Sequence, residues 1–402
     1  MSILKDSSVY FCGELLSKSI PFLLLPYLSK KLGVDGFGEL SYYQTFLSLF
    51  VIFLGLSQDS AVTRYFYTHG KRSLNLVVNT GYFYTFTLGF FASIFCWVFK
   101  SEIMFYLVLS AISQVVLSVQ LSVRQCQKQI FSYTLIQLAL TSTNTLLTIF
   151  ILEIYENNLV EKRILAILIS NVLVTFLSYM VYKKRIKYKK FTWLQYRISF
   201  LYIISFGFPM IFHHFSFFIK TQLDRIFIFH QFSETELGIY SMGVQISSVL
   251  SIFIMAINKA VVPYLFERLK EKELNLIDLH RWAFYSLFII VIILLIIFLI
   301  PESFLLFLLG KEFEGVKYYV IMFCFSAGLG IPYVILVNYL FFYGKTKEIS
   351  FCSVLSTAIY FMALVLFMFT EIIYIPYASI LGAIGILPIL YFITIKVRKE
   401  NE

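Results

Sequence analysis

Long apolar runs dominate the hydrophobic pattern of this chain. A membrane-spanning helix needs about 20 mostly apolar residues. Runs of that length recur from one end of the chain to the other, separated by short polar turns. The pattern predicts twelve transmembrane helices, at residues 7–28, 40–61, 77–99, 103–123, 130–152, 163–182, 198–223, 237–262, 281–301, 317–342, 349–370 and 373–395.

The first apolar run reads as a retained membrane helix rather than a cleaved signal. Residues 7–28 contain Glu14 and Lys18, lack a clear small-x-small cleavage site and lead directly into further hydrophobic segments. We therefore expect this helix to stay in the protein.

The composition agrees with an all-α polytopic membrane protein. Of 402 residues, 59% are hydrophobic and only 14% are charged, and the mean hydropathy is +0.82. Soluble domains carry about 25% charged residues, so ordinary soluble domains and disordered chains are excluded. A disulfide scaffold is excluded as well. The cysteines are scattered without disulfide or zinc spacing, which predicts small buried hydrophobes: Cys12, Cys96, Cys126, Cys324 and Cys352.

The placement of the cations predicts the orientation. The net charge of +10 comes mainly from short loops between apolar runs, so we expect no nucleic-acid surface. Twenty-two lysines and arginines fall in one alternate set of loops and seven in the other. Because cytoplasmic loops are the basic ones, both termini are predicted to be cytoplasmic. No loop is long enough for an extramembrane domain.

The spans fall into two sets of six. Residues 1–182 are predicted to form an N-terminal six-helix bundle and residues 198–402 a C-terminal one, joined by a basic cytoplasmic linker at 183–197. The run KKRIKYKK at 183–190 also resembles a nuclear signal or a nucleic-acid patch. Its position at the midpoint favours a linker near anionic lipid headgroups.

The two halves align at an offset of 200 residues. Residues 37–41 (FGELS) correspond to 237–241 (LGIYS), and residues 61–66 (AVTRYF) to 261–266 (VVPYLF). Both pairs occupy matched places in the predicted topology. Parallel repeats of this kind build transporters in which two bundles rock about a central pathway.

Short motifs carry a family resemblance over the whole chain. Leu32-Gly33-x-x-x-Phe37-Gly38 resembles the Leu-Gly-x-x-x-aromatic-Gly signature of polysaccharide flippases. Asp224-Arg225, followed by residues 236–241, resembles the matching place in their second half, although Phe232-Ser233 stands where a glycine is more usual. The chain thus resembles Wzx-type flippases of the multidrug/oligosaccharidyl-lipid/polysaccharide (MOP) exporter superfamily. The resemblance implies a pseudo-two-fold fold like that of the MATE exporters.

Charged residues inside predicted spans are functional candidates. A charge in mid-helix costs about 2.5–3.5 kcal/mol on insertion scales. Glu14 and Lys18 share a helix face at i, i+4, and Lys220 and Asp224 repeat this spacing beside Arg225. The resemblance implies that such helices line a central cavity. The alternatives are a self-satisfied pair for Glu14 and Lys18, and the outer headgroup level for Asp224 and Arg225.

Further candidates lie nearer the predicted span ends. Asp59, Arg64 and Lys259 either face the cavity or are ordinary interfacial residues. The cations within spans outnumber the carboxylates by one, which suits an anionic substrate. We assign Lys18, Arg64, Lys220, Arg225 and Lys259 as substrate-binding candidates. The candidates for ion coupling are Glu14, Asp59, Asp224 and His213.

Histidines offer a second route for protons. His213, His214 and His230 could relay protons near neutral pH, or could simply pack or snorkel. His213 and His214 are adjacent and point in different directions, so no metal site is expected. No Walker A sequence occurs, so ATP is not expected to bind by that motif. We expect no cofactor.

The resemblance implies a flippase in the bacterial cytoplasmic (inner) membrane. Its substrate would be an undecaprenyl-pyrophosphate-linked oligosaccharide, moved from the cytoplasmic to the periplasmic leaflet with an ion gradient. Membrane lipid and the polysaccharide polymerase machinery are the expected partners. Two alternatives remain: a drug or cation exporter of the same superfamily, and a membrane O-antigen polymerase. A polymerase would need a large outer loop with catalytic residues, and none occurs.

Overall fold

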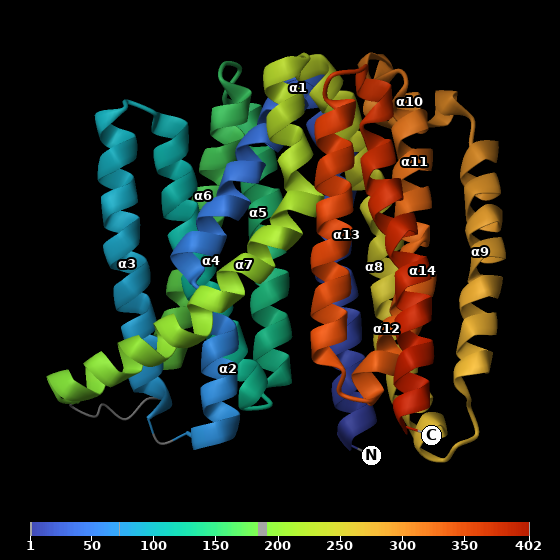
Figure 1. The fold of residues 1–402 in the computed structure, drawn as a ribbon. Coiled ribbons are helices and arrows are strands. Elements are labelled where there is room, and N and C mark those ends of the chain that lie inside the picture. Colours follow the sequence, from blue (N-terminus) through green and yellow to red (C-terminus); the bar gives the residue numbers. More distant parts are fainter. Residues whose placement is uncertain (1, 72, 184–190, 402) are drawn as a thin grey trace. The chain divides into compact units, whose positions relative to one another are not determined.

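The computed structural model describes residues 2–71, 73–183 and 191–401, and this part of the chain contains helices and turns without strands (Figure 1). Residues 184–190 of the predicted basic linker lie outside the described residues. The helices are α1 (Ser2–Gly55), α2 (Gln58–His69), α3 (Leu74–Val98), α4 (Glu102–Cys126), α5 (Ile130–Ile154), α6 (Leu159–Lys183), α7 (Trp193–Gln231), α8 (Glu234–Lys270), α9 (Leu276–Leu299), α10 (Glu302–Leu309), η1 (Lys311–Phe313), α11 (Val316–Gly328), α12 (Gly330–Phe342), α13 (Thr346–Phe367), η2 (Ile372–Tyr374) and α14 (Pro376–Asn401).

The number of spans agrees with the sequence pattern. Within the described residues, eleven helical stretches are long and apolar enough to cross a membrane. The first, Gly13–His69, has 57 residues, which at 1.5 Å per residue is about 85 Å against a hydrocarbon core of about 30 Å. It is long enough to cross twice, which accounts for twelve spans. The predicted all-α polytopic membrane fold is confirmed, whereas the cytoplasmic placement of the termini stays a prediction.

A single glycine divides this first stretch. Gly33 has φ 70° and ψ −178°, outside helical geometry, and the helix resumes after it. A positive φ is strained for residues with a Cβ, and glycine adopts it freely. The first glycine of the flippase-like signature therefore marks the turn between the first two spans.

The chain forms two compact units. Unit 1 comprises residues 1–32 and 40–218, and unit 2 comprises residues 33–39 and 219–402. The boundary between them falls inside α7. Residues 33–39, here called the crossover segment, belong to unit 2 although unit 1 residues flank them on both sides. The predicted division into six-helix bundles about the linker at 183–197 stays a prediction.

Helix α4 lies at the centre of the packing in unit 1. It packs against α3 on one side and α6 on another. Its residues Leu107, Val108 and Ala111 are almost fully buried against Leu47 and Leu54 of α1. The sequence places these side chains on one face of α4 at helical spacing, so hydrophobic periodicity explains the position of this helix.

Unit 2 has its own core. Leu279 of α9, Leu340 of α12, Cys352 of α13 and Leu390 of α14 are completely buried together. Four cysteines of the chain are buried and unpaired, as the sequence predicts: Cys96, Cys126, Cys324 and Cys352. The side chain of Cys12 lies outside the described part.

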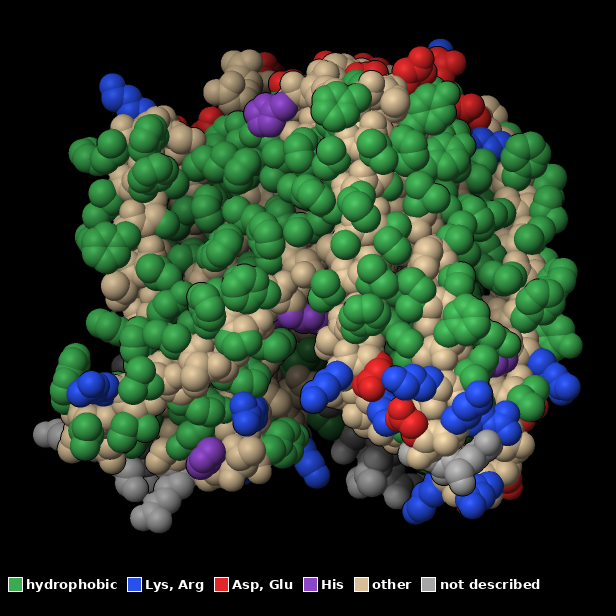
Figure 2. Space-filling view, viewed as in Figure 1, with side chains coloured by type: hydrophobic (Ala, Val, Ile, Leu, Met, Phe, Trp, Pro, Cys, Tyr) green, Lys and Arg blue, Asp and Glu red, His purple; other side chains and the backbone are tan. Residues whose placement is uncertain are grey.

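The outward faces of both units are hydrophobic. Figure 2 shows apolar side chains over α9, where Phe284, Phe288 and Ile292 are each more than half exposed. Soluble proteins rarely expose apolar patches on this scale. Lysines and arginines gather instead at the end of unit 2 where α14 finishes. Together with the eleven apolar helices, this surface identifies a multi-pass membrane protein.

The crossover segment is held in unit 2 by polar and aromatic contacts. Its partners come from the beginning of α8 and from η1. The contacts are Thr235 Oγ1 donating to Asp35 Oδ1 at 2.5 Å, the Val34 amide donating to Glu312 Oε2 at 3.3 Å, and the Phe37 ring edge-on to Phe313 at 6.0 Å. The aromatic position of the signature therefore serves packing.

Two repeat-equivalent glycines meet at this place. A Cβ on Gly38 would collide with the backbone of Glu234 and Gly238, and a Cβ on Gly238 would collide with the Val34 carbonyl. Small residues allow membrane helices this close approach. Gly38 and Gly238, which lie 200 residues apart, are thus equivalent positions of the repeat, and each packs closely against the segment that contains the other.

The start of α8 gives a test of local stability. Ser233 accepts from the Glu236 amide and Glu236 Oε2 accepts from the Ser233 amide, both at 3.1 Å, forming a capping box. Ser233→Ala is expected to lower the free energy of unfolding by about 1 kcal/mol. The control is Ser101→Ala, because Ser101 precedes α4 without a side-chain cap bond. Thermal unfolding in detergent should show a shift for Ser233 alone; equal shifts would contradict the capping role.

Candidate functional site

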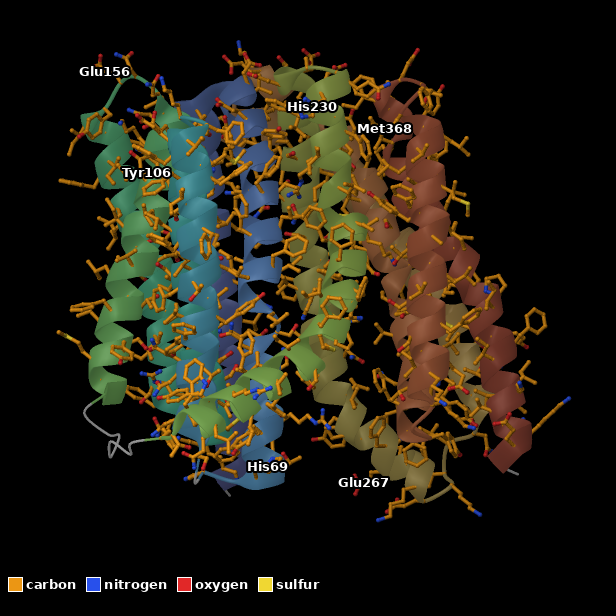
Figure 3. All side chains as sticks on the ribbon, turned by 60° about the vertical axis from the view of Figure 1, so that its left-hand side comes forward. His69, Tyr106, Glu156, His230, Glu267 and Met368 are labelled. Atoms are coloured by element: carbon orange, nitrogen blue, oxygen red, sulfur yellow. The ribbon has the colours of Figure 1, made fainter. Side chains whose placement is uncertain are left out.

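A buried polar cluster joins three helices of unit 2. We call it the α7 cluster. Its members are Lys220, Asp224 and Arg225 of α7, Tyr240 of α8, and Ser356 and Tyr360 of α13. Figure 3 shows His230 and Met368 at one end of unit 2 and Glu267 at the other. At 1.5 Å per residue, Asp224 lies about 9 Å and Lys220 about 15 Å along α7 from His230, so the cluster lies inside α7 and not at its end.

Asp224 is the most enclosed charge in the cluster. Its side chain is 5% exposed, accepts a hydrogen bond from the Tyr240 hydroxyl and accepts from the Arg225 amide at 2.9 Å. Tyr240 is held in turn by edge-on contacts with Tyr319 and Phe323. The carboxylate is therefore fixed by helices α7, α8 and α11 and is shielded from solvent.

Arg225 retains an unused donor. It is 8% exposed and its guanidinium donates to Gln222 Oε1 at 2.5 Å, while its buried Nε has no hydrogen-bond partner. The Tyr360 hydroxyl is also buried without a partner, and it interacts electrostatically with Asp224 and Arg225. Buried polar groups are normally satisfied. The two unpaired groups leave the cluster able to accept a further polar ligand.

Lys220 connects α7 to two more helices. Its Nζ donates to Ser356 Oγ at 2.8 Å, and Ser356 Oγ donates to the Gly382 carbonyl of α14 at 2.8 Å. The α7 cluster thus holds two cations and one carboxylate. A net positive charge in a low-dielectric setting favours an anion over a cation.

The second span is interrupted in unit 1. Residues 40–61 were expected to form one helix, but Leu56 and Ser57 have φ values of 45° and 50°, and α1 ends at Gly55 before α2 begins. Hydroxyl groups of α3 satisfy the freed carbonyls: Thr85 donates to Leu54 O at 3.0 Å and Tyr84 to Phe53 O at 3.2 Å. Broken helices of this kind are a feature of transporter binding sites.

Three predicted site residues surround this interruption. Asp59 is in the first turn of α2 and interacts electrostatically with His214 of α7. Arg64, further along α2, is exposed and lies over the Phe206 ring at 5.3 Å. The exposed His213 ring stands 5.7 Å from His214 at 62°. The structure therefore brings Asp59, Arg64 and the histidines to neighbouring parts of α2 and α7.

The remaining predicted residues lie elsewhere. Glu14 and Lys18 form an ion pair at 2.8 Å with side chains 36% and 48% exposed, the self-pairing that their spacing allows. Lys259 is exposed on α8. Its neighbour Asn258 accepts from Asn338 of α12 at 2.8 Å.

Two arginines near the ends of predicted spans are buried between helices. Arg163 is buried in α6 and donates to Asn144 at 2.6 Å and Thr148 at 2.5 Å, both on α5. Arg124 is 2% exposed in α4 and donates to the Ser178 carbonyl at 2.8 Å. The guanidinium fork lets arginine join helices through several donors, and the polar partners on neighbouring helices account for the burial of both side chains.

The sequence reading also missed the polar partners of the α7 cluster. Tyr240 falls inside the repeat patch LGIYS, and a hydroxyl within reach of an intramembrane carboxylate was a usable signal. Ser356 belongs to a run of small polar residues inside an apolar span. Tyr360 carries no comparable signal, because tyrosine is common throughout the chain.

Comparison with other proteins places the chain in a family. Residues 3–269 match the model of the family described as polysaccharide biosynthesis protein. An uncharacterized membrane protein of Haemophilus influenzae is 67% identical over 402 residues, covering 100% of this chain and 99% of the relative. The Lsg locus putative protein 1 of the same organism is 58% identical over 399 residues, covering 99% and 100%.

Solved structures agree on the fold. A multidrug-resistance MATE transporter of the MOP superfamily, in an inward-facing conformation, matches with a TM-score of 0.69 at 16% identity, covering 96% of this chain and 99% of that one. The lipid II flippase MurJ matches with a TM-score of 0.71 at 14% identity, covering 96% and 87%. With a family model that spans most of its length, this chain belongs to the polysaccharide biosynthesis protein family and has the fold of the MOP superfamily.

Proposed function

We propose that this protein is a flippase for polyprenyl-pyrophosphate-linked oligosaccharides such as O-antigen repeat units. It moves them from the cytoplasmic to the periplasmic leaflet of the bacterial inner membrane by alternating access. Membership of the polysaccharide biosynthesis family and the transporter fold support this proposal. The fold shared with a lipid II flippase supports a lipid-linked cargo in particular.

One observation carries the proposal: the α7 cluster is a net-positive polar site inside a membrane span. Two cations, Lys220 and Arg225, face a single carboxylate, and the Arg225 Nε remains unpaired. Guanidinium groups suit phosphate oxygens because of their planar fork of donors. A cationic drug would meet repulsion there, so the cluster favours an anionic headgroup.

The energetics require a hydrated polar route. Moving one unpaired hydroxyl into hydrocarbon costs about 2–7 kcal/mol, and an oligosaccharide carries many. Polar groups in the spans, with the two bundles rocking about them, lower this barrier while the lipid tail stays in the bilayer. The polysaccharide polymerase machinery then receives the translocated oligosaccharide.

An ion gradient is the proposed energy source. One charge crossing 100 mV supplies about 2.3 kcal/mol, enough to bias an inward–outward equilibrium. Glu14, Asp59, Asp224 and His213 are the proposed coupling candidates. The excess of cations in one set of loops supports cytoplasmic termini and a cytoplasmic linker at 183–197.

The test is translocation in liposomes. Purified protein is reconstituted with a polyprenyl-pyrophosphate oligosaccharide, and exposure of the sugar on the far leaflet is followed with and without a pH gradient. Arg225→Ala is expected to slow translocation about tenfold or more, as loss of a charge-assisted bond costs about 1.5–3 kcal/mol. Lys345→Ala is the control, because Lys345 forms an exposed ion pair with Glu400 at 2.6 Å.

Each alternative has its own outcome. Gradient-driven efflux of a cationic dye without sugar translocation would replace the proposal with a drug exporter. Polymerised sugar chains would replace it with a membrane polymerase. Sugar exposure that depends on the protein and on Arg225, but not on Lys345, supports the flippase.

A further inference from the structure

Unit 1 contains a large apolar groove between α3, α4 and α6, here called the α3–α4–α6 groove. Its volume is about 1010 Å³. Phe86, Phe90 and Ile94 of α3 and Val172 and Phe176 of α6 line it, each 43–63% exposed. Side chains this exposed on a membrane-spanning helix face lipid, so the groove opens to the bilayer.

Three polar side chains of the groove wall donate their hydrogen bonds to backbone carbonyls. Thr175 Oγ1 donates to the Ser113 carbonyl at 3.1 Å, and Ser113 Oγ donates to the Leu109 carbonyl at 3.0 Å. Tyr82 OH donates to the Val116 carbonyl at 3.4 Å. A sugar would find few partners on such a wall, whereas a hydrocarbon chain needs none. The lining therefore fits the tail of a lipid.

The groove runs along most of the bilayer. On α3 it extends from Tyr82 to Trp97, fifteen residues or about 22 Å of helix, against a hydrocarbon core of about 30 Å. Trp97 and Phe105 line it where α3 ends and α4 begins. Tyr82 and Tyr179 line it toward the opposite end. A long chain lying parallel to the helices fits these dimensions.

One end of the groove helices is basic, and the other carries charges of both signs. Lys71 precedes α3 and Lys128 follows α4, and both are exposed. No Asp or Glu occurs in residues 60–101, 103–152 or 164–223, so the basic end of all three helices has no acidic residue. The other end carries acidic and basic residues together: Lys100, Glu102, Glu153, Glu156, Glu161, Lys162 and Arg163. Figure 3 shows Tyr106 and Glu156 opposite His69, which lies just before α3.

We propose that the α3–α4–α6 groove binds the isoprenoid chain of the lipid carrier, with its phosphate at the Lys71–Lys128 end. The charge at that end complements an anionic head, and the groove wall complements its tail. The proposal rests on the proposed function for the choice of an isoprenoid carrier over bilayer phospholipid. The groove and the α7 cluster are built from different residues, so binding of the carrier at the groove can be tested without changing the α7 cluster.

Photolabelling tests the tail site without requiring transport. The reconstituted protein is labelled with a C20 isoprenyl monophosphate carrying a diazirine on its chain, and the labelled peptides are identified by mass spectrometry. We expect label on α3, α4 and α6. Val172→Trp, which fills the groove, should lower this labelling about tenfold, the effect of an overpacking cost of about 1.4 kcal/mol. Leu173→Trp is the matched control, since Leu173 is similarly exposed on α6 and lies outside the lining.

A second pair of variants tests the head. Lys128→Gln should weaken labelling by the monophosphate about fivefold, the effect of one cation near an anionic lipid. It should leave labelling by the matching isoprenyl alcohol unchanged. Lys100→Gln is the control. Like Lys128, Lys100 follows a helix and has a positive φ, but it lies at the opposite end of the groove.

A competition experiment shows which lipid supplies the hydrocarbon chain that occupies the groove. Displacement of the label by unlabelled isoprenyl phosphate, but not by an equal amount of phosphatidylglycerol, supports the proposal. Equal displacement by phosphatidylglycerol overturns it in favour of a general lipid groove, and label confined to other helices overturns it outright. If sugar is translocated but the Val172→Trp variant is labelled as strongly as the native protein, the proposed tail site is wrong and the proposed flippase activity is supported. If the groove is labelled as expected but no sugar is translocated, only the proposed flippase activity is wrong.

Discussion

Asp224→Ala is expected to stop translocation and to lower the free energy of unfolding by about 3–5 kcal/mol. The carboxylate is the only acidic member of the α7 cluster. Its removal leaves Arg225, which is 8% exposed, and the partly buried Lys220 without a compensating charge. Thermal unfolding in detergent measures the loss of stability, and the liposome assay measures translocation.

The Tyr240 hydroxyl should be coupled to the same carboxylate. Tyr240→Phe alone is expected to cost about 1–2 kcal/mol, because a buried acceptor loses a donor. When Tyr240→Phe is added to Asp224→Ala, the further loss of unfolding free energy should be close to zero, because the hydrogen bond is already absent. Full additivity of the two losses would contradict the contact.

An exposed acidic residue is the control for Asp224. Glu267 of α8 is exposed, and exposed charges contribute about 0–1 kcal/mol. Glu267→Ala should therefore leave stability and translocation almost unchanged. Equal damage from Glu267→Ala and Asp224→Ala would show that burial is not what makes Asp224 sensitive.

Gly38→Ala is expected to destabilise the repeat crossing. Its Cβ would meet the backbone of Glu234 and Gly238, which no side-chain rotation can move away. Overpacking costs about 1–3 kcal/mol, and a backbone obstacle favours the upper part of that range. Gly238→Ala should cost a similar amount, because its Cβ meets the backbone at Val34.

Gly330→Ala provides the comparison. Gly330 has no atom within 4 Å of an added Cβ and begins α12. Alanine is the better helix former by about 0.5–1 kcal/mol, so stability should stay the same or rise. An equal loss of thermal stability from Gly330→Ala and from Gly38→Ala would contradict the close backbone approach at Gly38.

The sequence was sufficient for the fold because membrane spans are encoded by length and apolarity alone. Every predicted run falls on helical segments, although residues 40–61 and 317–342 are each divided between two helices. The turn at Gly33 is visible as a glycine in the signature. The interruption at Leu56 and Ser57 was not predictable, since neither residue is a helix breaker by type. It depends on hydroxyls that Tyr84 and Thr85 supply from another helix.

The candidate site was only partly predictable for the same reason. Charges in apolar spans are conspicuous, so Lys220, Asp224 and Arg225 were found. Their neutral partners were not, because a serine or tyrosine in a membrane helix is common and gains its role only from its neighbours. Arg163 stands at the edge of an apolar run, and only the packing of α5 against α6 shows that its side chain is buried.

The crossover segment has a consequence for how the protein is made. Residues 33–39 leave the ribosome about 200 residues before their partners at the beginning of α8. At about 5–20 residues per second, this interval lasts about 10–40 s. Throughout that time Gly38 and the aromatic ring of Phe37 have no docking place in unit 2. The first hairpin therefore has to wait in the membrane with its turn unpaired, and the native arrangement is completed only after much of the second half has been inserted.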